Sequence, residues 1–280
     1  MKRLIVNGDD FGLCEGVSRG ILQAWRDGIL TSATMLTNMP GFSSSAAVAR
    51  ENPDFPLGVH LNVLWGEPVS SPSKVASLLD SNGEFLRSPF RFAMRRFSGR
   101  IRDEDLRREF EAQISRFMDA GFSPTHLDTH KHIHALPGVL KVMIESGRRF
   151  GIRRIRYPLE RRLWRTMGRN PSSWAKRIVI SAGASCGAGE LRRADVRTTD
   201  DFSGVDPVTC ATASRLRAFL RDLPDGTTEL VCHPGVDDDV STRYSLHPPD
   251  RRAELTALLD QSVMDTVKEC GILLICFREL

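Results

Sequence analysis

The feature that most restricts the fold of this chain is an alternation of short buried strands with helices, which begins at the first residues. Apolar runs at 4–6, 31–36 and 57–62 have the length and composition of strands, while 15–26 and 46–49 between them suit helices. No turn sequence typical of a β-hairpin joins one strand to the next. The pattern predicts βα units and a parallel sheet, in which functional side chains gather at the carboxyl ends of the strands.

A second feature is the concentration of four of the seven histidines, with an aspartate, in residues 126–134. In an extended chain, every even position of this stretch lies on one face. In a helix, three of the histidines stack at i, i+4 spacing and the fourth points elsewhere. Pro124 and the threonines of the stretch favour the strand. We therefore expect a strand whose imidazole and carboxylate groups contribute to a divalent-metal site.

The alternation continues along the chain and is interrupted twice. Turn-forming residues break up 65–100, and a basic and then Gly/Ala-rich segment breaks up 159–195, so both are expected to be lids or substrate-binding loops. Further helices are predicted at 103–120, 137–150, 214–223 and 251–270, and further strands at 152–157, 196–199, 228–232 and 272–277. Because no internal repeat or linker is evident, residues 1–280 are predicted to form a single domain.

Charge and cysteine content restrict the classes of partner and compartment. The net charge of +4, from 39 basic and 35 acidic residues, is too small to indicate a nucleic-acid-binding protein. Arginines cluster in 87–108 and 148–169, a pattern typical of solvated helix faces and also of surfaces that attract an anionic ligand or membrane. The six cysteines show no C-x-x-C spacing, and no apolar run reaches the roughly 18 residues of a membrane-spanning helix. We expect a cytoplasmic protein, for which peripheral membrane contact and homo-oligomer formation stay open.

Metal-binding and proton-transferring residues follow four of the predicted strands: Asp9-Asp10, His60, the histidine stretch and His233. A parallel barrel brings such strand ends to one mouth. One carboxylate and two imidazoles suit a hydrolytic divalent ion, and a second carboxylate held off the ion can accept a proton from water. Asp9 and Asp10 supply one acid for each task, provided that the strand end turns so that both reach the site.

These residues resemble the YdjC/ChbG family of carbohydrate deacetylases, including its hopanoid-associated subgroup. The resemblance rests on four stretches in the same order along the chain, namely residues 4–12 (LIVNGDDFG), 58–61 (GVHL), 125–134 (THLDTHKHIH) and 233–235 (HPG). It is weakest across 65–100 and 159–225. At Gly8 the family more often has alanine, a small-for-small change that should not disturb a metal site.

The resemblance implies an α/β fold, a deformed (β/α) TIM-like barrel with parallel strands of the glycoside hydrolase/deacetylase type. It implies a metal-dependent enzyme that removes the N-acetyl group from an N-acetylated amino sugar, in an oligosaccharide or glycolipid, by attack of a metal-bound water. The implied ligands are Asp10, His60 and His130, usually for Mg²⁺, with Zn²⁺ or another divalent ion as alternatives. Asp9 is implied as the general base, and His233 as the general acid or a stabiliser of the oxyanion.

Six further residues are candidates for orienting the ligands or contacting substrate: His126, Asp128, His132, His134, Asn62 and Arg156. The first two suit orientation, because metal-bound imidazoles usually need hydrogen-bond partners. The next two could line a sugar pocket or only extend a polar strand end. Arg156 also lies in a basic run that is typical of a surface.

Two other functions stay open. A metallo-phosphoesterase would also use H-x-H and D-D patterns, but such sites often hold two metals and more carboxylates. A non-catalytic sugar-binding barrel is the third alternative, because fold does not dictate activity. The adjacent acids Asp9 and Asp10 argue against this last function, since a binding protein needs no spare base.

Overall fold

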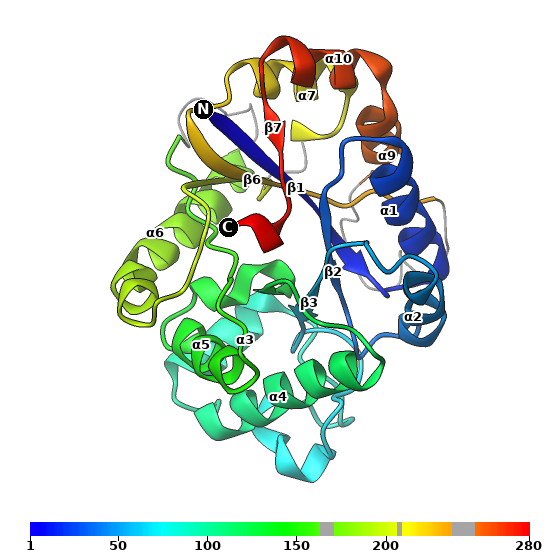
Figure 1. Ribbon diagram of the computed structural model, residues 1–280. Helices are drawn as coiled ribbons and strands as arrows, with labels where there is room; N and C mark the ends of the chain where they lie inside the picture. Colours follow the sequence, from blue (N-terminus) through cyan, green and yellow to red (C-terminus); the bar gives the residue numbers. More distant parts are fainter. Residues whose placement is uncertain (163–170, 206–208, 237–249) are drawn as a thin grey trace.

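The computed structural model describes residues 1–162, 171–205, 209–236 and 250–280. Its centre is a sheet of parallel strands in the order β4-β3-β2-β1-β6-β5, with β7 paired to β1 (Figure 1). The strands are β1 (Lys2–Phe11), β2 (Ser32–Met35), β3 (Leu57–Leu61), β4 (Leu127–Thr129), β5 (Asp201–Ser203), β6 (Gly226–Cys232) and β7 (Leu273–Leu274). The predicted parallel α/β fold is confirmed.

The sheet curls toward closure between β4 and β5 through isolated bridges. Leu127 bridges Ile155, and Arg154 bridges Arg197, both in parallel. The prediction of a regular strand at 152–157 is therefore wrong, because these residues form single bridges on either side and Pro158, which lacks an N–H, ends the segment. The sheet is a curled half-barrel, which is the deformed form predicted.

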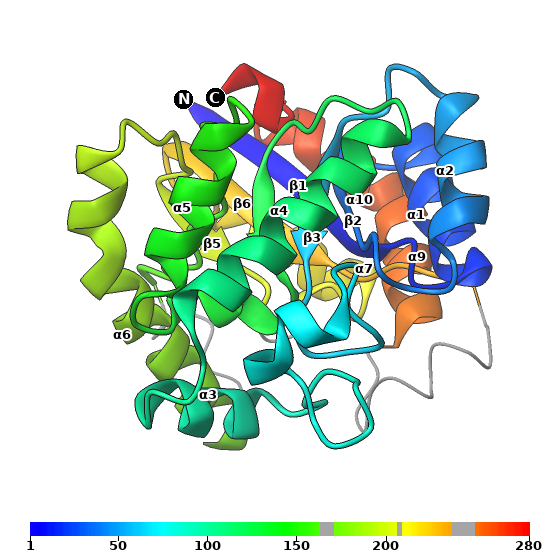
Figure 2. The same ribbon diagram turned by 90° about the horizontal axis from the view of Figure 1, so that it is seen from below.

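Helices lie outside the sheet and connect its strands (Figures 1 and 2). They are α1 (Glu15–Asp27), α2 (Phe42–Arg50), α3 (Pro89–Phe97), α4 (Asp103–Asp119), α5 (Val139–Arg149), α6 (Pro171–Arg193), α7 (Ala213–Arg221), α9 (Arg251–Leu259) and α10 (Gln261–Glu269). The single helix predicted at 251–270 is wrong, because Asp260 is extended and its side chain accepts from the Ser262 N–H at 2.8 Å, which caps a new helix. In the described part of the chain, no helix is both long enough and apolar enough to cross a membrane.

Both predicted excursions contain helices. Residues 65–100 form two 3₁₀ turns, Pro72–Lys74 and Ala76–Leu78, and then α3. The second excursion contains α6, and its residues 163–170 lie outside the described residues. Two strand predictions were wrong: the segment 196–199 forms only a single bridge at Arg197 and β5 begins after it, at Asp201, while the strand expected at 272–277 is reduced to Leu273–Leu274.

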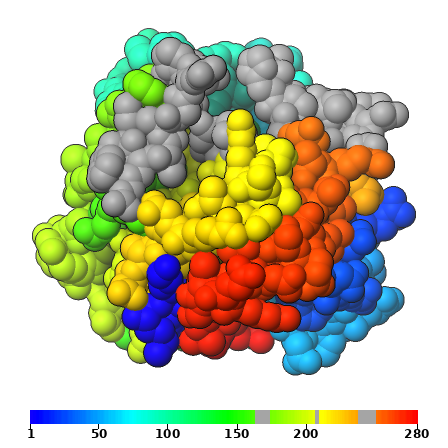
Figure 3. Space-filling model, turned by 90° about the horizontal axis from the view of Figure 1, so that it is seen from above, coloured from blue at the N-terminus to red at the C-terminus, as the bar shows by residue number. Residues whose placement is uncertain are grey.

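The two chain ends meet at the amino end of the sheet. Figure 3 shows the first residues of β1 beside the C-terminal segment, and the Arg3 guanidinium donates to the Glu279 carbonyl at 2.8 Å. Phe277 is fully buried there and packs with Ile5 and Ile275. The centre of the sheet is closed at this end by apolar side chains.

Candidate metal centre

β1 ends in a bulge that brings two adjacent carboxylates to one space. The pairing of β1 with β2 joins Gly8 to Ala33 and then Phe11 to Met35, so the register shifts between the two pairs. Asp10, inside the shift, has a φ of 72°, a left-handed conformation that few non-glycine residues adopt. The bulge breaks the strict alternation of side chains, and both Asp9 and Asp10 line the same cavity. This is the turn that the sequence argument required.

Three potential ligand atoms converge at this bulge. The His60 Nε2 lies 3.3 Å from the His130 Nδ1 and 3.6 Å from the Asp10 Oδ1, and the last two atoms are 3.2 Å apart. All three residues are almost completely buried. Two imidazole nitrogens and one carboxylate oxygen in this arrangement are a donor set that fits a divalent cation.

A second group, Asp9, His60 and Asp128, is equally compact. Its carboxylates are already engaged, because the Arg156 guanidinium donates to both Asp9 oxygens at 2.6 and 2.7 Å and lies 2.7 Å from the Asp128 Oδ2. A cation there would have to compete with a buried guanidinium. The group that contains Asp10 is therefore the better candidate.

His60 is oriented by the neighbouring strand. β3 and β4 pair so that His60 is opposite Asp128, whose Oδ1 lies 2.6 Å from the His60 Nδ1. The Thr34 hydroxyl donates to the other Asp128 oxygen at 3.0 Å. With Nδ1 as the donor to Asp128, the Nε2 lone pair faces Asp10 and His130. Burial alone would lower the pKa of His60, but the carboxylates of Asp128 and Asp9 raise it above its ordinary value of 6.5.

The chain turns sharply directly after β4. Lys131 and His132 have φ values of 56° and 55°, within a 3₁₀ segment that spans His130–Ala135. The Thr129 hydroxyl stabilises the turn, since it accepts from the His134 N–H at 3.2 Å and hydrogen-bonds the His134 Nδ1 at 2.6 Å. The prediction of an extended chain over 126–134 is therefore wrong beyond Thr129. The turn directs His130 toward Asp10 and leaves His132 on the cavity surface, whereas His134 is held by Thr129.

Arg156 is fully buried at the centre of an ion-pair network, although the sequence placed it in a basic run. Besides Asp9 and Asp128, it donates from Nε to the Glu229 Oε1 at 2.7 Å. Burial alone would raise the pKa of Asp9, but Arg156 holds that pKa well below its ordinary value of 3.8. Glu229 is the third carboxylate that shares this guanidinium. Here the effect of burial is larger than that of Arg156, and the pKa of Glu229 rises to about 7.

Arg251 is a site residue that the sequence argument missed. It begins α9, and its guanidinium donates to the Asp10 Oδ2 at 2.7 Å. This contact outweighs the effect of burial and lowers the pKa of Asp10 well below its ordinary value. Asp10 thus presents one oxygen to Arg251 and the other to the two histidines. The only signal in the sequence was that the helix predicted at 251–270 begins with an arginine.

His233 follows β6 directly and lines the same cavity. Its backbone N–H donates to the Glu254 Oε2 at 2.6 Å, which fixes the turn after the strand. Burial lowers the pKa of the imidazole to about 4, against the opposing effect of Asp10 and Asp9. The side chain is therefore a neutral imidazole at pH 7 in the absence of other ligands.

The cavity that contains these groups has a volume of about 220 Å³. The Trp65 ring packs on the His130 ring at 3.9 Å, and the Lys131 ammonium lies 5.1 Å from the centre of the same indole. The lining residues come from the carboxyl ends of several strands and from α6 and α9: Asp9, Asp10, His60, Trp65, His130, Lys131, His132, Lys176, Gly204, Val205, His233 and Arg251. The predicted meeting of distant strand ends is confirmed.

Among the predicted site residues that do not line the cavity, Asn62 and His126 also make no hydrogen bond or ion pair with the ligand cluster in the described part of the chain. The Asn62 side chain accepts from the N–H groups of Leu64 and Trp65 and donates to the Trp65 carbonyl, so it holds the start of the excursion. The His126 ring stacks on Phe277, with centroids 3.5 Å apart and planes 11° apart. The expectation that these two side chains contact substrate or the ligands finds no support in their positions.

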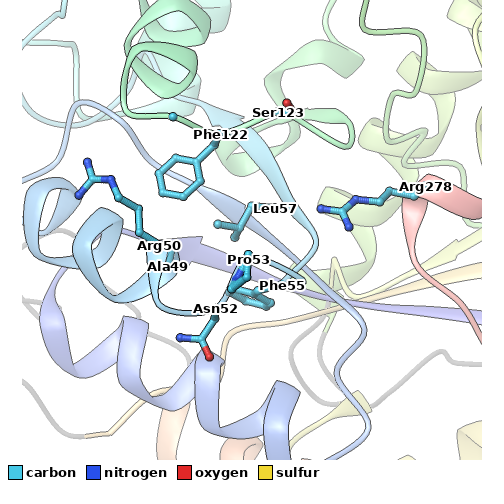
Figure 4. A pocket seen from close by; sticks show the side chains of 10 residues that line it. Ala49, Arg50, Asn52, Pro53, Phe55, Leu57, Phe122, Ser123 and Arg278 are labelled. Carbon is cyan, nitrogen blue, oxygen red and sulfur yellow. The ribbon is translucent and has the colours of Figure 1, made fainter.

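A second cavity, of about 360 Å³, lies at the amino end of β3 (Figure 4). Arg50 and Arg278 approach it from opposite sides, with Leu57 and Phe122 between them. No carboxylate, imidazole or thiol is among the described residues that line it. Of these two cavities, only the one at the carboxyl end is lined by carboxylate and imidazole groups of the described residues.

Comparison with known proteins gives consistent matches over the whole chain. The sequence profile of the family described as "YdjC-like protein" matches residues 3–269. A Brevibacillus brevis protein named "Carbohydrate deacetylase" is 32% identical over 281 residues, which cover 99% of each chain. A Mus musculus protein of the same name is 37% identical over 246 residues, which cover 83% of this chain and 78% of its own. The solved structure of an Enterococcus faecalis protein, named as a candidate for cellobiose-phosphate cleavage, superimposes with a TM-score of 0.78 at 26% identity over 99% of this chain and 98% of its own.

Proposed function

This chain belongs to the YdjC-like protein family, and from that membership we propose that it is a metal-dependent hydrolase that removes the N-acetyl group from an amino sugar. The names of the Brevibacillus brevis and mouse relatives support the class of reaction. The observation that carries the proposal is the convergence of Asp10, His60 and His130 beside a second, separately held carboxylate, Asp9.

Asp10, His60 and His130 would hold the divalent ion. When bound, the ion supplies Lewis acidity, which lowers the pKa of water and polarises the amide carbonyl. The family resemblance implies Mg²⁺. Two imidazole nitrogens with one carboxylate oxygen also suit Zn²⁺, whereas Mg²⁺ usually keeps oxygen ligands. Adding different divalent ions back to the chelated protein therefore identifies the ion that the site prefers.

Asp9 is proposed to accept the proton of the attacking water. Its two oxygens are fixed by the Arg156 guanidinium, and its Oδ1 also accepts from the Asn7 side-chain amide at 2.9 Å. One oxygen lies 3.9 Å from the His60 Nε2, so the carboxylate borders the ligand cluster. The lowered pKa keeps Asp9 ionised at neutral pH, so that it can accept a proton, although it is a weaker base than an ordinary carboxylate.

His233 is proposed to stabilise the oxyanion through a hydrogen bond from its imidazole, since the lowered pKa leaves it neutral at pH 7 and without a proton to give as a general acid. It lines the cavity together with Asp9 and Asp10 and comes from β6, on the other side of β1 from β2 and β3. Water adds its oxygen to the acetyl carbon, the carbon–nitrogen bond breaks, and the nitrogen takes up the proton that Asp9 accepted from the water, which gives the free amine. The products are acetate and the amino sugar.

The direct test is acetate release from N-acetylated chito-oligosaccharides by the full-length protein. Chelation should abolish the release, and Mg²⁺, Mn²⁺ and Zn²⁺ added back separately should restore it to different extents. A phosphate ester assayed in parallel tests the phosphoesterase alternative. Phosphate release without acetate release by the reconstituted protein would exclude the proposed reaction.

Asp9→Asn separates the proposed base from the ligand cluster. We expect acetate release to fall by about a hundredfold or more, since that is the usual contribution of a general base. Metal content by atomic emission should stay close to wild type. Asp54→Asn, at an exposed position, is the matched control and should change neither quantity. A parallel loss of metal and activity would assign Asp9 to the ligand set.

A further inference from the structure

The outward face of α3 carries three apolar side chains that are exposed to solvent. Phe90, Met94 and Phe97 recur at i, i+4 and i+7, which places them on one face of the helix, and they are 73%, 54% and 66% exposed. Phe92, on the opposite face, is the buried residue of this helix. Amphipathic helices of globular proteins usually bury their apolar stripe. The three exposed residues are called the α3 apolar row below.

The surroundings of the α3 apolar row are basic. Residues 85–102 contain six arginines and no aspartate or glutamate. Arg91 and Arg100 are exposed, and neither guanidinium has a hydrogen-bond or ion-pair partner among the residues that the structure describes. An apolar stripe flanked by unpaired arginines is the composition of helices that lie in the interface of an anionic membrane.

The α3 helix is firmly attached, so the exposure of the row is not a result of a frayed helix. Pro89 stands in the first turn, and the Ser88 hydroxyl accepts from the Arg91 N–H. Arg95 and Arg96 point inward and donate to the carbonyls of Leu79 at 2.7 Å and Pro137 at 3.1 Å. These two hydrogen bonds therefore hold the helix in an orientation that exposes its apolar row.

The row lies at the same end of the molecule as the candidate metal centre. The excursion that contains α3 leaves the carboxyl end of β3 and includes Trp65, which lines the cavity (Figure 2). On α6, Lys176 lines the cavity, and Ile178 and Val179 just beyond it are 57% and 64% exposed. Exposed apolar side chains are thus present on two segments that border the cavity.

We propose that the α3 apolar row docks on the surface of an anionic phospholipid bilayer. The row would insert at the boundary between the lipid headgroups and the acyl chains, and Arg91 and Arg100 would contact lipid phosphates. A second copy of the chain is a poorer occupant, because a two-fold contact through this face would bring arginines of both copies together without a carboxylate in 85–102 to pair with them. This docking is independent of the proposed reaction, and it would turn the cavity end of the molecule toward a membrane-bound substrate.

Sedimentation of the full-length protein with vesicles tests the proposal. The protein should bind phosphatidylcholine vesicles that contain phosphatidylglycerol, bind pure phosphatidylcholine weakly, and lose binding as salt rises. Phe90→Ser/Met94→Ser/Phe97→Ser should weaken binding by at least about tenfold, because the inserted apolar area is removed. Arg91→Gln/Arg100→Gln should weaken it by about fivefold per arginine.

Met118→Ser, at another exposed apolar position on α4, is the matched control and should bind like wild type. Thermal unfolding of each variant checks that the fold is retained, since the substituted side chains are exposed. Vesicle binding that is the same for wild type and the triple variant would overturn the proposal. So would a lipid-free wild-type oligomer that the triple variant converts to a monomer, since a second copy would then cover the row. Failure of acetate release would leave these measurements unaffected.

Discussion

His126 and His130 are one helical turn apart in sequence and both are buried, yet they lie in opposite environments. The His130 ring meets Asp10 at 3.2 Å, His60 at 3.3 Å and the Trp65 indole, at the carboxyl end of the sheet. The His126 ring lies flat on Phe277 at the amino end. One imidazole faces carboxylate and nitrogen donors, and the other faces a benzene ring.

The difference arises from position along the strand. His126 and His130 flank β4 (Leu127–Thr129), and because the chain is extended up to Thr129, the side chains at 126, 128 and 130 follow one another at increasing distance from the amino end of the sheet. His126 contributes to the closed apolar layer, Asp128 to the middle layer that holds Arg156, and His130 to the layer that opens on the cavity. Histidine count alone therefore says little about metal binding, and the height in the barrel decides it.

The largest effect should come from the upper layer. His130→Ala removes one of three proposed ligand donors, and we expect the metal affinity to fall by at least about a hundredfold. Acetate release should fall by about a thousandfold, or about 4 kcal/mol of transition-state stabilisation. Metal content after dialysis and single-turnover acetate release measure the two effects. A variant that keeps both its metal and its activity would remove His130 from the centre and erase the contrast with His126.

Changes in the middle layer should have an intermediate effect, which concerns the stability of the protein and its dependence on pH. Glu229 shares Arg156 with Asp9 and Asp128, and its pKa is raised from 4.5 to about 7. The folded protein therefore keeps a proton on Glu229 that the unfolded chain releases near pH 4.5. This group lowers the free energy of unfolding as the pH rises from 4.5 to about 7, by roughly 3 kcal/mol at most.

Glu229→Gln replaces the titrating group by a neutral one of the same shape. The variant should match wild type near pH 4.5 and be more stable than wild type at pH 8, as measured by urea unfolding across the pH range. Glu145→Gln, which alters a surface ion pair with Arg107, should leave the profile unchanged. An equal destabilisation of Glu229→Gln at both pH values would show that Glu229 is ionised in the folded protein.

The fold was predictable from the sequence where local patterns decide structure. The helical spacing of 15–26 and 103–120 and the apolar runs at 4–6 and 57–62 correspond to α1, α4, β1 and β3. The errors fall where long-range contacts decide. Ile155 has the composition of a strand residue but forms one bridge, and the helix predicted at 251–270 is divided by the capping side chain of Asp260.

The composition of the site was partly predictable, and its geometry was not. The sequence placed Asp10, His60 and His130 together because each follows or ends a strand, and the structure brings them together. The contacts of Arg251 with Asp10 and of Arg156 with Asp9 join residues 241 and 147 positions apart, so no spacing rule could indicate them. The turn at Asp10, by contrast, was expected from the two adjacent acids, since both could reach one site only if the strand end turned.

The smallest effect should come from the lower layer and is the strictest test of the comparison. His126→Leu keeps an apolar contact with Phe277, removes a buried Nε2 that has no hydrogen-bond partner in the described residues, and loses the 2.8 Å hydrogen bond with Thr125. These changes partly offset one another, so the free energy of unfolding should change by about 1 to 2 kcal/mol or less. Metal content and acetate release should stay within about threefold of wild type. A threefold change in rate corresponds to about 0.6 kcal/mol of activation free energy. A loss of metal in His126→Leu comparable to that in His130→Ala would mean that the apolar layer positions the ligands, and height in the barrel would no longer distinguish the two histidines.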